Sequence, residues 1–163
     1  MIKKIIFSFI LYSIIFTSAY AAGSSDSGSS NTKSNYDKAV KLIKIAKNFE
    51  KKEKIKNANK NYEKAHKLLI KFNNNNPNEA DTLNYLGFTT RKLGDYKTAE
   101  QYYLQGLSIE PNHIGINEYL GELYVATNRH NLALERLEVL NGCNCKEYKE
   151  LKDIIAGKKV SKY

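Results

Sequence analysis

Residues 80–113 read ADTLNYLGFTTRKLGDYKTAEQYYLQGLSIEPNH and decide the fold, because their landmarks recur 34 residues away on either side. The recurring positions are Tyr62, Tyr96 and His130; Ala65, Ala99 and Ala133; Leu69, Tyr103 and Leu137; Pro77 and Pro111; and the pairs Leu86-Gly87 and Leu120-Gly121. A fixed period of this length indicates a stacked array of helical repeats.

The spacing of apolar residues at i, i+3 and i+4 predicts helices outside this stretch as well. A long or broken first helix begins at Asn35, and a polar turn near 57–61 leads to a second helix that ends near Phe72. The later helices are expected over about 78–92, 96–108, 112–126, 130–140 and 146–156. In the second helices, Ala99, Tyr103, Leu107, Ala133, Leu137 and Leu140 are expected to be buried. Pro77 and Pro111 each close a unit, since proline cannot continue a helix.

The N-terminal segment 1–21 has the pattern of a secretory signal peptide. A short basic start is followed by a largely apolar run of 12 residues from Ile5 to Phe16 and then by small residues that end in Ala21. An uncleaved membrane anchor is the alternative, but a spanning helix needs about 20 apolar residues. We therefore expect cleavage near Ala21 and a periplasmic protein, with 22–34 as a flexible Gly/Ser linker.

Charge is distributed unevenly along the chain. Residues 33–71 hold 13 Lys and 4 acidic residues, whereas the remainder is close to neutral. Such an asymmetry favours an acidic partner or an anionic membrane surface for the N-terminal part. The alternative is a solvated, lysine-rich helix with no partner. Nucleic acid is not expected as a partner, because the protein is predicted to be exported.

Several landmarks together resemble the tetratricopeptide repeat, of the exported bacterial type. They are Leu86-Gly87, the turn Gly94-Asp95-Tyr96, Ala99 and Pro111. The resemblance implies an all-α fold, a right-handed α-solenoid of antiparallel helix pairs. Its parts would be a degenerate basic first repeat at 35–79, a repeat at 80–113, a related repeat at 114–147, and a capping helix with tail at 148–163. A final helix is expected because it covers the exposed core edge of the array.

The same resemblance implies a binding function. Tetratricopeptide repeat proteins typically hold an extended peptide or a partner helix in a concave groove lined by the first helix of each repeat. The groove positions carried over are Asn84, Phe88, Arg91, Glu118 and Glu122, together with Lys47, Glu50 and Lys54 from the first repeat. Phe88 would be the hydrophobic anchor, with Arg91 beside it as a hot spot. Each position has the alternative of being ordinary exposed helix surface. The Lys and Asn set that clamps a terminal carboxylate in some family members is not reproduced.

The chain has two cysteines, Cys143 and Cys145. Export favours a disulfide, because the compartment is oxidising. Some exported bacterial repeat proteins end in a similar stretch, a cysteine followed later by Cys-x-Glu-Tyr-x-x-Leu, and this resemblance implies a structural pair that anchors the cap. Two alternatives are disulfide exchange with clients and Cu(I) binding with His113 or His130. Because two thiolates are an incomplete metal site, we assign no metal and no cofactor.

No sequence motif indicates an enzyme. The chain lacks a phosphate-binding glycine loop, a nucleophile elbow and a paired-histidine metal motif. A small-molecule substrate is therefore not expected. The sequence predicts an interaction scaffold and leaves the identity of its partner open.

Overall fold

The computed structural model describes residues 27–161, so the predicted signal peptide lies outside the described residues. Over this range the chain forms seven helices and no strand. They are α1 (Ser27–Lys51), α2 (Ile55–Asn75), α3 (Ala80–Lys92), α4 (Tyr96–Ile109), α5 (Ile114–Ala126), α6 (His130–Val139) and α7 (Lys146–Ile155). The expectation of an all-α fold is confirmed.

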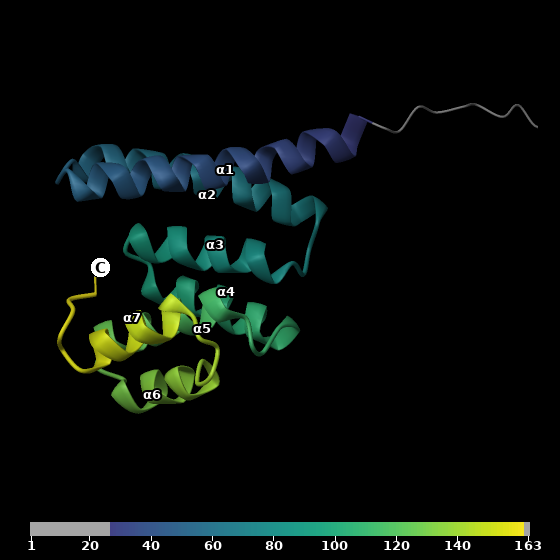
Figure 1. Cartoon of the computed structure of the whole chain (residues 1–163). Helices are drawn as coiled ribbons and strands as arrows, with labels where there is room; N and C mark the ends of the chain where they lie inside the picture. Colours follow the sequence, from purple (N-terminus) through teal and green to yellow (C-terminus); the bar gives the residue numbers. More distant parts are fainter. Residues whose placement is uncertain (1–26, 162–163) are drawn as a thin grey trace, which may run out of the picture.

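The helices stack as pairs in chain order (Figure 1). α1 packs on α2, α3 on α4, and α5 on α6, while α2–α3 and α4–α5 contacts join one pair to the next. The last helix, α7, packs against α5 and α6 and so covers the end of the array, as predicted. In Figure 1 the yellow tail after α7 turns back toward the level of α3. The arrangement is a short helical-repeat solenoid.

Small residues let the paired helices approach closely. Ala65, Ala99 and Ala133 stand at equivalent positions in the second helix of each pair, and all are fully buried. Gly87 lies against the ring of Tyr103, where an added Cβ atom would stand 2.5 Å from Cε1. Because that distance is far inside van der Waals contact, a larger residue would require one of the two helices to shift. The absence of a side chain at Gly87 therefore allows α3 and α4 to pack closely.

Two expectations about the first repeat need correction. α1 begins at Ser27, so the linker predicted over 22–34 is helical from that residue onward. The break between the first two helices lies at 52–54 and not at 57–61. Glu53 adopts a left-handed conformation with φ of 57°, and the amide of Lys54 donates to the carbonyl of Phe49. The polar run after this break stays helical because Ala58 is fully buried and holds the first turns of α2 in place.

Later boundaries agree with prediction to within about two residues, but some repeat positions are packed differently. Tyr62 is fully buried, whereas Tyr96 is 36% exposed and His130 is exposed. Leu137, expected in the core, is only partly buried, while Leu140 is 1% exposed. Of the three residues at this repeat position, only Tyr62, in the first helix pair, is a core residue.

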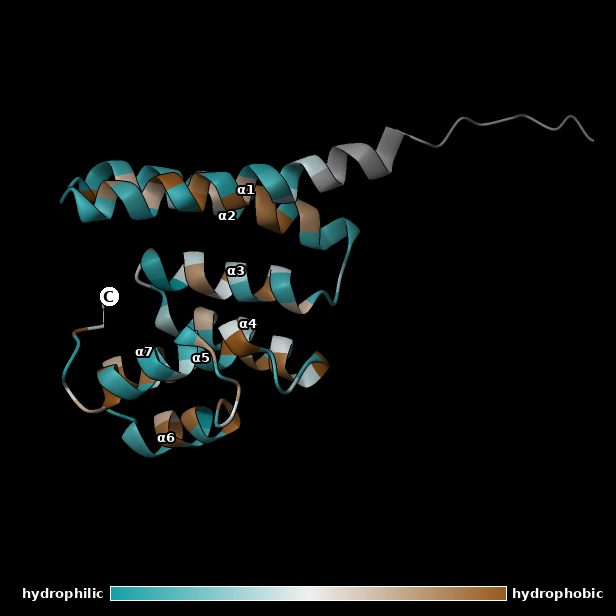
Figure 2. Cartoon of the chain, viewed as in Figure 1, coloured by the Kyte–Doolittle hydropathy of each residue, from teal (hydrophilic) through white to brown (hydrophobic). Residues whose placement is uncertain are grey.

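The long α1–α2 pair differs from the rest of the molecule in its surface. Figure 2 shows both helices coloured largely as hydrophilic, with hydrophobic residues interspersed along their length. Of the lysines from 38 to 71, Lys47 is partly buried and the others are exposed. Within the described part of the chain, no helix combines the length and the apolar character needed to cross a bilayer.

Candidate partner-binding groove

One cavity of about 510 Å³ opens between the first helices of the repeats and the cap. We call it the groove. It is lined from α1, the start of α2, α3, α5, α7 and the C-terminal tail: Lys47, Glu50, Lys51, Ile55, Phe88, Lys92, Glu118, Tyr119, Glu122, Lys146, Glu147, Glu150, Ile154, Lys159 and Val160. A cavity of this size is within the range of protein ligand sites.

Aromatic rings and a lysine form the centre of the groove. The rings of Phe88 and Tyr119 lie with their centroids 5.1 Å apart. The ammonium of Lys47 stands 4.4 Å above the Phe88 ring and donates a hydrogen bond of 3.2 Å to the Tyr119 hydroxyl. Burial lowers the pKa of Lys47, and Glu118 and Glu122 act against that shift. These three side chains come from three successive repeats, so the groove exists only in the assembled array.

A buried arginine fixes the position of the α5 side of the groove. Arg91 in α3 donates to the carbonyl of Tyr119 at 2.7 Å and pairs with Glu122 at 3.3 Å. The side chain of Arg91 is fully buried, and that of Glu122 is 5% exposed. A buried charge is costly to leave unpaired, so this contact holds α3 and α5 in register. Arg91 thus lies beneath the groove and supports it.

The α1–α3 edge is closed by a second polar cluster. Lys92 pairs with Glu50, and Glu50 also accepts a hydrogen bond of 2.9 Å from the Tyr62 hydroxyl. Burial lowers the pKa of Lys92, and the contact with Glu50 opposes that effect. Lys92 is therefore engaged within the protein, whereas Lys51, which also lines the groove, is exposed.

The α5–α7 wall carries four carboxylates: Glu118, Glu122, Glu147 and Glu150. Glu118 is 6% exposed, and among the residues that the structure describes no hydrogen bond or ion pair reaches it. Burial, reinforced by the charges of Glu122, Glu147 and Glu150, raises its pKa to about 8, and Lys47 acts in the opposite direction. This wall therefore has a surplus of acidic groups.

The C-terminal tail runs along this acidic wall. Lys159 forms an ion pair of 3.1 Å with Glu150, and the hydroxyl of Ser161 donates to Glu122 at 3.4 Å. Val160, between them, is 85% exposed. The tail is held by polar contacts without an apolar anchor.

The five predicted partner-binding residues are placed unequally. Phe88, Glu118 and Glu122 line the groove, and so do Lys47 and Glu50, whereas the exposed Lys54 does not. Asn84 is 7% exposed and lies near Gly115, outside the groove lining. Phe88 is 1% exposed and Arg91 is 2% exposed, so neither has the expected exposed position. The reason is that α5 and the side chain of Lys47 cover them.

Other lining residues were not predicted from the sequence: Tyr119, Lys92, Glu147, Glu150, Ile154 and the tail. For α7 a signal was present, because Glu147, Glu150 and Ile154 follow i, i+3, i+7 spacing and so share one helix face. The carboxylates of Glu147 and Glu150 on this face of α7 line the groove.

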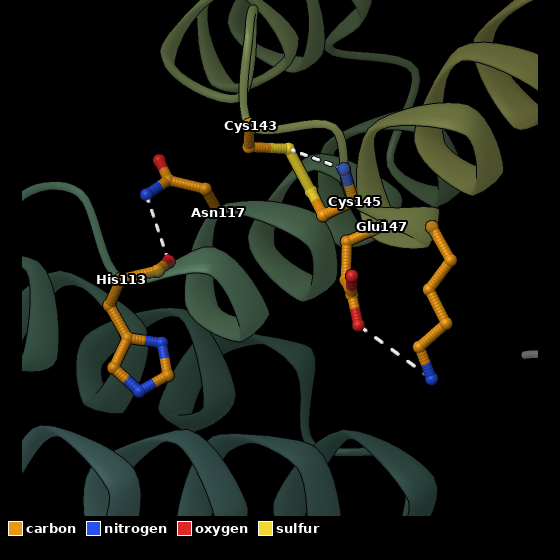
Figure 3. Close-up of a disulfide and its surroundings, with 6 residues drawn as sticks. His113, Asn117, Cys143, Cys145 and Glu147 are labelled. Carbon is orange, nitrogen blue, oxygen red and sulfur yellow. Dashed lines mark hydrogen bonds and ion pairs between the residues drawn. A yellow bond between two sulfur atoms is a disulfide. The ribbon is translucent and has the colours of Figure 1, made fainter.

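Cys143 and Cys145 form a disulfide at the turn before α7 (Figure 3). Their Cα atoms lie 5.2 Å apart, and the amide of Cys145, the N-cap residue of α7, donates to Cys143 Sγ at 3.3 Å. His113 accepts from the amide of Ile116 at the start of α5, and Asp81 contacts its other ring nitrogen. Between residues 27 and 161 no group of three or more metal-binding side chains comes together. The disulfide is thus a part of the cap and lies outside the groove lining.

Stacked antiparallel helix pairs with a groove along their first helices define a helical-repeat protein of the solenoid class. Residues 37–112 match the family model described as tetratricopeptide repeat. This part of the chain therefore belongs to the tetratricopeptide repeat family. Such repeats are generally non-catalytic interaction scaffolds. A search of curated protein sequences finds no match.

Solved structures show the same fold. The first tetratricopeptide domain of Spaghetti (RPAP3), bound to the HSP90 peptide SRMEEVD, is 17% identical with a TM-score of 0.53, covering 77% of this chain and 96% of that one. The Yersinia enterocolitica type III secretion chaperone SycD, in complex with a peptide of the translocator YopD, is 20% identical with a TM-score of 0.53, covering 74% and 88%. A second structure of SycD, an alternative dimer, is 21% identical with a TM-score of 0.52 and covers the same shares of the two chains, 74% and 88%. At these identities the likeness establishes the fold alone.

Proposed function

We propose that this protein is an exported tetratricopeptide scaffold that binds a peptide segment or helix of a partner protein in the groove. The observation that carries the proposal is the cavity of about 510 Å³, which is lined by side chains from every first helix and from the cap. It joins an aromatic centre to charged walls, the mixture that protein-binding sites use for affinity and orientation.

The similar structures support this proposal by analogy. The Spaghetti domain holds an HSP90 peptide, and SycD holds a YopD peptide. A groove in the same type of fold is therefore a reasonable place for a peptide in this chain. We assign no reaction to the protein.

Export to the periplasm is part of the proposal. It rests on the basic start, the apolar run and the small residues at 1–21. The disulfide between Cys143 and Cys145 supports it, because such bonds persist in oxidising compartments. Amino-terminal sequencing of the protein from its native cell tests this step, and a mature terminus near Ala22 is the expected result.

Photo-crosslinking tests the groove directly. A photoreactive phenylalanine analogue replaces Ile55, which is 54% exposed on the groove rim, or Leu104, which is 48% exposed on α4 away from it. After irradiation in the native cell, the Ile55 variant is expected to give one discrete adduct and the Leu104 variant none. Equal adducts from both sites, or none from Ile55, would rule out the groove as the binding site.

The exposed lysines of α1–α2 favour a second candidate contact, with an acidic partner or an anionic membrane surface. Lys41, Lys44 and Lys64 are exposed, so their charge is available to solvent. Vesicles of phosphatidylserine are expected to bind the protein at low salt and release it at high salt, because exposed charges are screened. Replacing the three lysines by Gln should weaken binding, whereas Lys97→Gln on α4 should not. Binding that is indifferent to salt would contradict this contact.

A further inference from the structure

We infer that the groove accepts a positively charged partner segment and places one of its lysine or arginine side chains against Glu118 and Glu150. This inference rests on the proposed function, and it specifies which chemistry the partner presents. It is carried by three features of the groove: an unpaired buried carboxylate, cations that are already engaged, and a tail that occupies the acidic wall.

The first feature is the surplus of negative charge on the α5–α7 wall. Glu122 is paired with Arg91, and Glu147 lies 3.7 Å from Lys146. Glu118 has no such partner among the described residues, although it is only 6% exposed and faces the groove. A buried carboxylate without a partner is unfavourable when ionised, so an incoming cation would relieve this cost.

The second feature is that two of the three groove-lining lysines from α1 and α3 are already engaged, while the third, Lys51, is exposed. Lys92 forms an ion pair with Glu50, and the Lys47 ammonium lies over the Phe88 ring and donates a hydrogen bond to the Tyr119 hydroxyl. Burial lowers the pKa of both lysines. An acidic segment would have to displace these contacts and would also meet the four carboxylates of the other wall. Charge complementarity therefore selects a basic segment.

The third feature is the chain's own tail, residues 157–161. The Lys159 ammonium sits 3.1 Å from Glu150, and the Ser161 hydroxyl reaches Glu122. This shows that a basic segment can lie along the wall and make ionic contacts there. Because Val160 is 85% exposed, no apolar burial holds the tail, and a partner segment with more ionic contacts to the wall can replace it.

The probes for the test are two fluorescein-labelled peptides. One is a tandem copy of residues 157–163, GKKVSKY, and the other has every Lys replaced by Glu. Fluorescence anisotropy measures their binding to the full-length mature protein and to three variants. These are Glu118→Gln combined with Glu150→Gln, Glu63→Gln as an exposed carboxylate on α2 outside the groove lining, and Lys159→Gln.

The lysine peptide is expected to bind at least tenfold more tightly than the glutamate peptide. The double variant should weaken this binding at least fivefold, and Glu63→Gln should leave it unchanged. Lys159→Gln should tighten it, because the competing tail loses its ion pair. The affinity should also rise between pH 7 and pH 9 as Glu118 ionises, a rise that is absent in the double variant.

Three results would overturn the inference: equal or tighter binding of the glutamate peptide, no measurable binding of either peptide, or a fivefold loss in Glu63→Gln as well. Those results would leave the proposed function standing if the Ile55 adduct is still formed. Loss of the adduct would remove the proposed function whatever the peptides show. The two failures are therefore distinguishable.

Discussion

Arg91 of α3 and Glu122 of α5 form an ion pair of 3.3 Å across the boundary between two repeats, with side chains that are 0% and 5% exposed. The arginine also donates to the carbonyl of Tyr119. This contact gives Arg91 a structural role, since it joins two helix pairs and positions the acidic wall of the groove.

Replacing Arg91 should therefore lower the free energy of unfolding. Arg91→Ala leaves Glu122 buried without this partner, and breaking a buried ion pair from one side costs about 3–5 kcal/mol. Urea denaturation followed by circular dichroism measures the loss. Lys97→Ala, at an exposed position on α4, is the control and should change the free energy of unfolding by less than about 0.5 kcal/mol. A similar small effect for both variants would contradict the structural role of Arg91.

The close packing of Gly87 against Tyr103 leads to a second prediction, about the contact between paired helices. In Gly87→Ala the new methyl would stand 2.5 Å from the buried ring of Tyr103. Overpacking costs about 1–3 kcal/mol, which outweighs the gain of about 1 kcal/mol in helix propensity. We expect a lower melting temperature, and we expect Tyr103→Leu to cost less in the Gly87→Ala background than in the parent. Ser108→Ala, at an exposed position on α4, is the control and should not lower the melting temperature. If the destabilising effects of Gly87→Ala and Tyr103→Leu were simply additive, the contact between these two residues would be refuted.

Glu118 should make stability depend on pH. Its pKa is raised to about 8 in the folded protein, above the ordinary carboxyl value that it regains on unfolding. The folded state thus binds the Glu118 proton more tightly than the unfolded state does. The stability that this proton contributes is fully present below pH 4.5 and is lost as the pH rises through 8. Glu118→Gln mimics the protonated form. It should come within about 1 kcal/mol of the parent near pH 5 and exceed it at pH 9 by up to about 4 kcal/mol, because a shift from 4.5 to about 8 is worth about 1.4 kcal/mol for each pKa unit.

The groups that face Glu118 determine how this experiment is read. They are Glu122 on the same helix, Glu147 and Glu150 on α7, and Lys47 on α1. Glu63→Gln serves as the control, because Glu63 is exposed on α2 and does not line the groove. A Glu118→Gln effect that is constant from pH 5 to pH 9 would show that Glu118 titrates normally.

The disulfide allows the scaffold and thiol hypotheses to be separated. Labelling the denatured protein should find no free thiol without reductant and two with it, because Cys143 and Cys145 are paired. Cys143→Ser with Cys145→Ser opens a very short loop, so the expected cost is only about 1–2 kcal/mol. Partner capture should survive this double substitution. Loss of capture in a variant that remains folded would favour a thiol-based function.

The sequence predicted the helices well where the repeat period and the apolar spacing agree, as in α3 and α4. It predicted that Phe88, Glu118 and Glu122 face the groove, because the family pattern marks the inner face of each first helix. It could not predict that Arg91 and Phe88 are covered. Burial depends on how far α5 and Lys47, which are distant in sequence, lean over them. The acidic wall was also missed, because the placement of α7 follows from the accumulated rotations of all preceding helices.

Hydrogen exchange on the protein with and without its crosslink-identified partner tests the central claim most directly. The turn at 52–54 and the tail at 157–161 border the groove and lie outside the helices, so their amides report on its occupancy. The account predicts that the partner slows exchange in both segments and leaves the α4–α5 turn at 110–113, on the far side of the array, unchanged. Protection confined to 110–113, with 52–54 and 157–161 unaffected, would contradict it.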